Sequence, residues 1–202
     1  MPDRTRTGAL TVLAAGLALG TVLAAPAGAA PGAPGFLAAK DLPPHPSSSW
    51  TADRVKDGVP DSLLGCVTDA LPGYDARHRE FRTDLDTGAV QVTVVVGSAS
   101  KAKALQNRLN DEMRTCATEI EQNDPETEAA VKDYGSIAVE EGARVHGLHT
   151  VTTWGATDIH LLSVGRDGRT VTLVQWGQMG DFGDAPVKAF KKTTTTAVDK
   201  LR

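Results

Sequence analysis

Hydrophobic and polar positions recur along this chain with two different periods, which predict strands in some stretches and helices in others. From Val90 to Val96 a valine occupies every second position, as in a strand with one buried face. After Ser98, whose hydroxyl is suited to capping a helix, apolar residues recur in steps of three and four and predict a long amphipathic helix. Its apolar stripe consists of Ala102, Leu105, Leu109, Met113, Cys116 and Ile120.

The complete pattern predicts an α+β domain in which a central antiparallel sheet of about five to six strands has three helices packed on it. A short helix is expected after Pro60, ended by Pro72-Gly73, and a closing helix is expected after Pro186. The acidic stretch that follows Asn123 is expected to form a solvated loop. The expected strands are 79–85, 89–96, 136–140, 144–154, 157–165 and 169–176.

The last two expected strands are joined by Asp167-Gly168, which is a strong signal for a two-residue hairpin turn. With that turn Val164 faces Val171, and both faces of the hairpin are apolar. Helices are expected to cover one face. The other is a candidate cleft for a small apolar ligand or an extracellular protein, unless a helix or the segment around Trp50 covers it. The candidate cleft residues are Trp154, Ile159, Leu161, Val174 and Trp176.

Residues 1–29 have the three parts of a secretory signal peptide. Arg4 and Arg6 come first, an apolar run follows over residues 9–25, and the small residues Ala27-Gly28-Ala29 come last. The alternative is an uncleaved anchor helix, which the shortness and the alanine and glycine content of the run disfavour. The protein is therefore predicted to be secreted and extracellular.

The stretch after the predicted signal peptide is expected to lie outside the core. Residues 30–57 are rich in proline, glycine and serine, and this composition predicts a flexible leader. Trp50 is the exception, because a tryptophan in such a segment is expected to dock on the folded domain. Residues 58–202 are expected to form that domain.

Cys66 and Cys116 are the two cysteines of the chain. In an exported protein an even number of cysteines predicts disulfide pairing. Cys116 lies on the apolar stripe of the long helix and Cys66 in the short helix, so the bond is expected to tie one helix to the other beneath the sheet. The alternative is that both are free, buried thiols that pack as small hydrophobic groups.

Charge and hydropathy exclude several classes of partner. The net charge is −4, which argues against nucleic acid and anionic membranes as partners, because both require a basic face. No apolar run beyond the predicted signal peptide approaches the roughly 20 residues that a membrane-spanning helix needs. We expect a monomer without a cofactor.

Candidate catalytic and metal-binding motifs are weak. Ser98 and Lys101 match the S-x-x-K motif of penicillin-recognising enzymes, but the partner motifs S-D-N and K-T-G are absent, and capping explains the serine. His146 and His149 point to opposite faces of a strand. A metal pair between either of them and His160 is left as an alternative to surface histidines.

Because no nucleophile stands with a matching base, we expect a non-catalytic ligand-binding or sensor-like domain and not an enzyme. Two alternatives stay open. One is a secreted hydrolase that uses polar groups from the histidine-bearing strands, and the other is an extracellular protein–protein inhibitor.

Four stretches carry a resemblance to a known family: Leu63-Leu64-Gly65-Cys66, the run 92–100 leading into the long helix, the hairpin 165–171 and the end of the closing helix at 197–201. Through them residues 50–202 resemble the actinobacterial PknH-like extracellular sensor domains. The resemblance implies an α+β fold with helices on a central antiparallel sheet, and a cleft for an unidentified ligand. The chain departs from the family's kinase members because it has one potential disulfide where they have two, and neither a kinase domain nor a membrane span.

Overall fold

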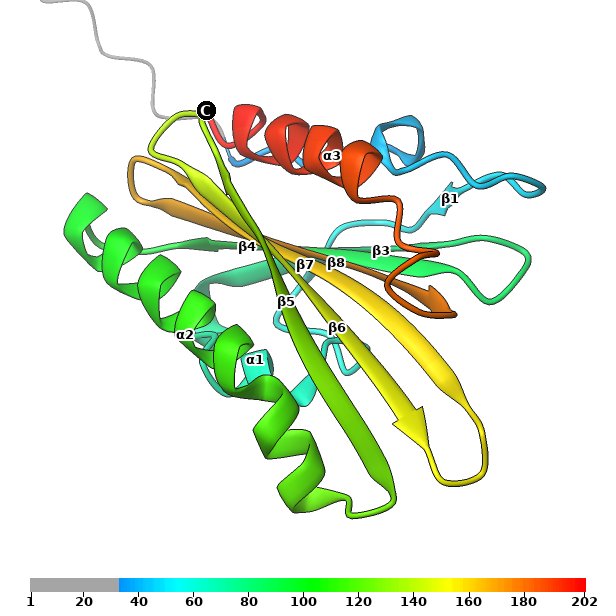
Figure 1. The fold of residues 1–202 in the computed structure, drawn as a ribbon. Coiled ribbons are helices and arrows are strands. Elements are labelled where there is room, and N and C mark those ends of the chain that lie inside the picture. The colour runs from blue at the N-terminus through cyan, green and yellow to red at the C-terminus, as the bar shows by residue number, and fades with distance from the viewer. Residues whose placement is uncertain (1–32) are drawn as a thin grey trace, which may run out of the picture. The chain divides into compact units, whose positions relative to one another are not determined.

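An antiparallel sheet of eight strands forms the centre of residues 33–202, the part of the chain that the computed structural model describes. Three α-helices pack on this sheet (Figure 1). The expected α+β class is confirmed, but the expected five to six strands understate the sheet. The predicted signal peptide over 1–29 lies outside the described residues.

The strands follow one another across the sheet in the order β1-β3-β4-β8-β7-β6-β5, and β2 pairs with β3 beside β1. Every pairing is antiparallel, so successive strands from β5 to β8 are joined as hairpins. The strand bounds are β1 Thr51–Ala52, β2 Lys56–Asp57, β3 Ala76–Arg82, β4 Gly88–Val95, β5 Thr127–Ile137, β6 Ala143–Thr152, β7 Thr157–Asp167 and β8 Thr170–Met179.

The helices divide between the two faces of the sheet. The short α1 (Gly65–Thr68) and the long α2 (Ala99–Asn123) lie on one face, and α3 (Val187–Asp199) lies on the other (Figure 1). The predicted cap of α2 is confirmed, because the Ser98 hydroxyl accepts a hydrogen bond from the backbone N–H of Lys101. Two short 3-10 turns, Ala39–Asp41 and Gly73–Asp75, complete the elements.

The core beneath α1 and α2 is the one that the valine alternation and the helical stripe predict. Val90, Val92 and Val94 point into it from β4, and the inner stripe of α2 packs against them. The predicted disulfide between Cys66 and Cys116 joins α1 to α2 at a Cα–Cα distance of 5.4 Å. A covalent link between the two helices on this face is thus confirmed.

The opposite face of the sheet is a second, closed core and not an open cleft. Ile159, Leu161, Val174 and Trp176 are each at most 2 % exposed, because α3 and the segment before β1 cover them. The predicted cleft is therefore corrected, and the alternative in which a helix and the Trp50 segment cover this face describes the structure. Trp154 does not join the other four, since it is 66 % exposed in the turn between β6 and β7.

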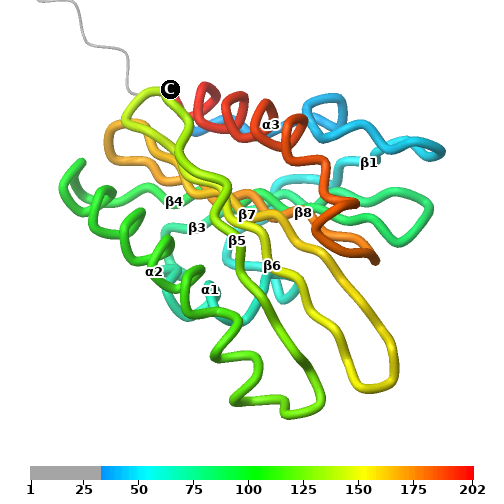
Figure 2. The backbone as a smooth tube through the Cα atoms, in the orientation of Figure 1, coloured from blue at the N-terminus to red at the C-terminus, as the bar shows by residue number. Residues whose placement is uncertain are grey.

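The expected flexible leader over 30–57 is, from residue 33 onwards, an integral part of the fold. We call residues 33–50 the N-terminal strap; it lies beside α3 on the same face of the sheet (Figure 2). Leu37 of the strap is fully buried, its N–H donates to Gln91 Oε1 at 2.7 Å, and its carbonyl accepts from Arg79 Nη1 at 2.9 Å. Trp50 docks as expected and donates from its indole to the Pro43 carbonyl. The composition of residues 30–57 predicted mobility because an average over many residues does not reveal a single buried side chain such as Leu37.

The acidic stretch after Asn123, expected as a loop, instead forms β5 at the edge of the sheet. Thr127, Ala129 and Val131 turn toward the core beneath α2, while Glu128, Ala130 and Lys132 alternate with them on the exposed side. Alanine and glutamate are weak strand formers, so pairing with β6 and contact with α2 decide this element rather than local propensity.

The turn between β7 and β8 is displaced by one residue from its expected position. Asp167 pairs with Thr170, so Gly168 and Arg169 form the turn and Val164 faces Leu173 in place of Val171. Of the two turn residues only Gly168 has a positive φ, as in hairpin turns that place glycine first. The shift changes each partner by two positions, which preserves the predicted face of every side chain.

Candidate functional site

A groove with a volume of about 500 Å³ opens on the α1/α2 face, at the end of the sheet where β3 turns into β4. Its floor is a row of paired residues across four strands, Arg82, Gly88, Gly177 and His160. The row shares the face of Val90, which lies two residues beyond Gly88 in β4. We call this hollow the sheet groove; its charged and titratable lining consists of Asp53, Glu80, Arg82, Asp86, Asp158 and His160.

Two neighbouring glycines create the hollow, because they remove side chains from the middle of that row. A Cβ on Gly88 would find only the Phe81 carbonyl oxygen, at 3.8 Å, so the space above it is open. A Cβ on Gly177 would come within 2.4 Å of His160 Nδ1, so the imidazole ring lies directly against the Gly177 backbone. Glycine within a strand permits this kind of close approach by a ring or a ligand.

Ion pairs neutralise part of the acidic lining. Asp53, which directly follows β1, pairs with Arg82 of β3. Glu80 pairs with Lys56 at 3.3 Å and accepts a hydrogen bond from the Ser62 hydroxyl at 2.8 Å. The Ser62 hydrogen bond, opposed by partial burial and aided by Lys56, lowers the pKa of Glu80. Glu80 is therefore ionised at neutral pH.

Asp86 and Asp158 carry the uncompensated charge of the groove. Neither forms a salt bridge with any residue of the described part of the chain, although Asp86 accepts a long hydrogen bond of 3.4 Å from the Met179 N–H. A concave site lined by unpaired charges of one sign concentrates ions of the opposite sign. The sheet groove thus carries a negative potential.

His160 adds a neutral hydrogen-bonding group to the floor. Burial lowers its pKa, and the nearby Asp158 carboxylate opposes that shift only in part, so the ring is uncharged at neutral pH. Its Nδ1 is buried and has no hydrogen-bond partner among residues 33–202. A neutral imidazole can donate at one nitrogen and accept at the other.

The histidines considered as metal ligands have separate hydrogen-bond partners. The His146 Nε2–H donates to Asn110 Oδ1 of α2 at 2.9 Å, whereas the His149 Nε2–H donates to the Thr157 hydroxyl on the opposite face. The predicted separation of His146 from His149 is therefore confirmed. Within residues 33–202 no three His, Cys, Asp or Glu side chains gather closely enough to hold a metal ion.

No family model, curated protein or solved structure matches this chain. The resemblance to PknH-like sensor domains therefore stays a prediction, and the site must be judged from its own chemistry. Among residues 33–202, no helix is both long enough and apolar enough to cross a bilayer.

The sheet groove contains a serine but no activated nucleophile. The Ser62 hydroxyl donates to Glu80 and not to His160, and Ser98 serves as a helix cap. Both cysteines are held in the disulfide. Covalent catalysis requires a nucleophile within hydrogen-bonding distance of a base. Ser62 lies 2.8 Å from the Glu80 carboxylate, but the lowered pKa of Glu80 makes that carboxylate a weak base.

Sequence reasoning missed this groove and named a covered face instead. The groove gathers Asp53, Asp86 and Asp158, which come from three separate stretches of the chain and meet only through the strand order. The sequence carries one signal for the groove, which is a glycine within each of two strands. Gly88 in β4 and Gly177 in β8 are these glycines, and they pair with each other.

Proposed function

We propose that the protein is a secreted, non-catalytic binding domain whose sheet groove takes a small, polar, positively charged molecule. The observation that carries the proposal is the open floor above Gly88, with two unpaired carboxylates, Asp86 and Asp158, on the lining. A volume of about 500 Å³ lies within the range of roughly 300–1,000 Å³ typical of small-molecule sites.

The groove offers complementary groups for such a ligand. The carboxylates would bind an ammonium or guanidinium group through charge-assisted hydrogen bonds, which are stronger than neutral ones. His160 would bind the ligand's polar substituents.

Secretion rests on the signal-peptide pattern of residues 1–29 and is compatible with the disulfide between Cys66 and Cys116. The hydrolase alternative lacks an activated nucleophile in the described residues. The protein–protein inhibitor alternative has no specific observation in its favour.

The test uses the mature protein and a panel of small cations: putrescine, ethanolamine, choline and arginine. Isothermal calorimetry is expected to show binding of at least one member, and binding is expected to fall sharply in Gly88→Val, which fills the floor without a strained backbone. Asp158→Asn should weaken it as well. Gly73→Val, at an open surface glycine away from the groove, is the matched control and should bind normally.

Two results overturn the proposal. One is the absence of binding by all four cations at millimolar concentration. The other is equal binding by the wild type and Gly88→Val, provided that circular dichroism shows both to be folded.

A further inference from the structure

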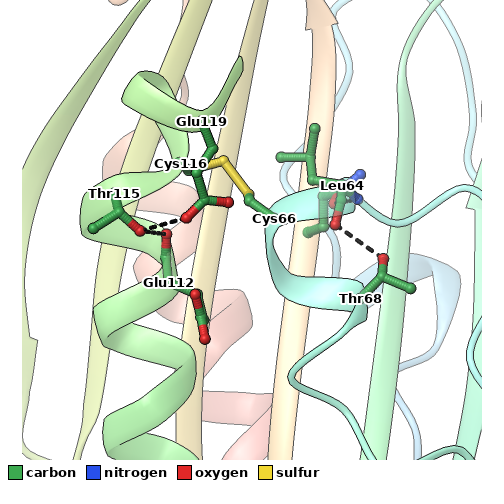
Figure 3. The surroundings of a disulfide bond; sticks show 8 residues. Leu64, Cys66, Thr68, Glu112, Thr115, Cys116 and Glu119 are labelled. Atoms are coloured by element: carbon green, nitrogen blue, oxygen red, sulfur yellow. Dashed lines mark hydrogen bonds between the residues drawn. A yellow bond between two sulfur atoms is a disulfide. The ribbon is translucent and has the colours of Figure 1, made fainter. Parts of the chain in front are cut away.

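We infer that a second hollow on the same face, between α1 and the C-terminal half of α2, docks a basic, amphipathic segment of a partner protein. It has a volume of about 660 Å³. The disulfide between Cys66 and Cys116 spans it, and Glu119 lies beside the bond on α2 (Figure 3). We call it the disulfide groove. This inference is independent of ligand binding in the sheet groove.

The centre of the disulfide groove is apolar. It is lined by Leu63 and Leu64 before α1, by the two linked cysteines and by Ile120 of α2. Leu64, Cys66 and Ile120 are only partly buried, so an apolar strip stays accessible between the two helices. Burying such a strip under the apolar side of a partner is favourable in proportion to the area removed from water.

The rim of the disulfide groove is acidic on both sides. Asp61 and Asp69 flank α1, while Glu119 and Asp124 stand at the end of α2. No lysine or arginine lines the groove, and within residues 33–202 none of the four carboxylates forms a salt bridge. An apolar centre between unpaired carboxylates is complementary to a helix that carries leucines on one side and lysines at its flanks.

The acidic end of α2 is a second, independent reason to expect a cation at this site, because its charge conflicts with the helix dipole. The last five residues of the helix, 119–123, contain Glu119 and Glu121 and no basic residue. Carboxylates at a helix C-terminus repel its partial negative charge, where lysine or arginine would stabilise it. Glu121 is accounted for by its hydrogen bond from the Ala129 N–H, whereas Glu119 accepts only from the Thr115 hydroxyl of its own helix (Figure 3). Local rules are broken most often where function requires it.

The two grooves are distinct sites although they share a wall. Ser62 lines the sheet groove, while Leu63 and Leu64 line the disulfide groove. The Gln175 side chain fixes this wall, because its Oε1 accepts from the Leu64 N–H and its amide donates to the Ser62 carbonyl. Loss of ligand binding above Gly88 therefore need not affect docking at the disulfide groove.

The test measures binding of an amphipathic lysine/leucine helical peptide to the full mature protein by fluorescence anisotropy. We expect binding that weakens as salt is added, and that falls by about tenfold or more in the double variant Asp69→Lys/Glu119→Lys. The control double variant Asp75→Lys/Glu128→Lys makes the same change in net charge outside both grooves, and it should bind nearly as the wild type does.

Three outcomes overturn the inference. The peptide does not bind, or the two double variants lose affinity equally, which would indicate attraction by net charge alone. The third is equal binding by a lysine/serine peptide without leucines, which would show that the apolar strip plays no part. Gly88→Val should leave peptide binding unchanged, so that a failure of the sheet-groove proposal can be told apart from a failure of this one.

Discussion

Removal of the disulfide is the perturbation whose magnitude follows most directly from the structure. Cys66 and Cys116 lie 50 positions apart, and closing a loop of that length in the unfolded chain corresponds to about 4 kcal/mol of stabilisation in the loop-entropy treatment. A typical domain has a free energy of unfolding of roughly 5–15 kcal/mol. The bond is thus expected to supply a large fraction of the stability.

The assay is differential scanning calorimetry of the wild type and of Cys66→Ala/Cys116→Ala. For a folded unit of this size each kcal/mol shifts Tm by roughly 2–4 °C, so a fall of roughly 8–16 °C is expected. Cys116 is fully buried, and its truncation leaves a small cavity. Wild type treated with a reductant has no such cavity, and it isolates the effect of the bond.

The reduced wild type should therefore melt far below the oxidised protein and slightly above the double variant. If reduction lowers Tm by less than about 3 °C while mass spectrometry confirms two free thiols, restriction of the unfolded chain by this bond is not a main source of stability. The same experiment on Cys66→Ala alone should give a melting temperature close to that of the reduced protein.

Three further predictions concern buried polar groups and the end of α2. Burial lowers the pKa of His146 below its usual 6.5, so the unfolded chain binds protons first on acidification. The free energy of unfolding in urea should therefore fall below about pH 6.5, and less so in His146→Gln; a constant value down to about pH 5 contradicts this. Gln91→Leu leaves the buried Leu37 N–H unpaired and should cost about 1–3 kcal/mol and speed proteolysis within the strap, whereas unchanged cleavage would refute its anchoring role. Glu119→Lys should raise the free energy of unfolding by ~0.3–1 kcal/mol, because it replaces an acid with a base near the helix C-terminus; a decrease would count against the conflict described there.

The elements that could be predicted from the sequence are those with a strong period. Ile159 and Trp176 fall on one face of the β7–β8 hairpin and Val164 on the other, as their alternation requires. The displaced turn did not change these faces. Each residue's cross-strand partner moves by two positions, and this leaves every side chain on the same side of the sheet. Ser98 could be identified as a cap because its hydroxyl precedes a long periodic segment.

The elements that could not be predicted depend on contacts between distant residues. The Leu37 N–H is bound by the side chain of Gln91, which lies 54 positions away. No local sequence pattern predicts that hydrogen bond. β5 becomes a strand through β6 and α2, against its acidic composition. The candidate cleft at Trp176 failed for the same reason, since the strap that covers it was assigned to a mobile leader.

The lengths of the covering elements explain why both hollows lie on one face. On the far face α3 and the N-terminal strap together close the sheet, down to a fully buried Leu37. On the near face α2 spans 25 residues but α1 only four, so α1 cannot close either the gap beside α2 or the end of the sheet at Gly88. The carboxylates around both gaps keep them hydrated and disfavour self-association through the apolar strip, because burying an unpaired charge is costly. A positively charged partner would remove that penalty, which is why we propose cations rather than apolar molecules as the occupants of both hollows.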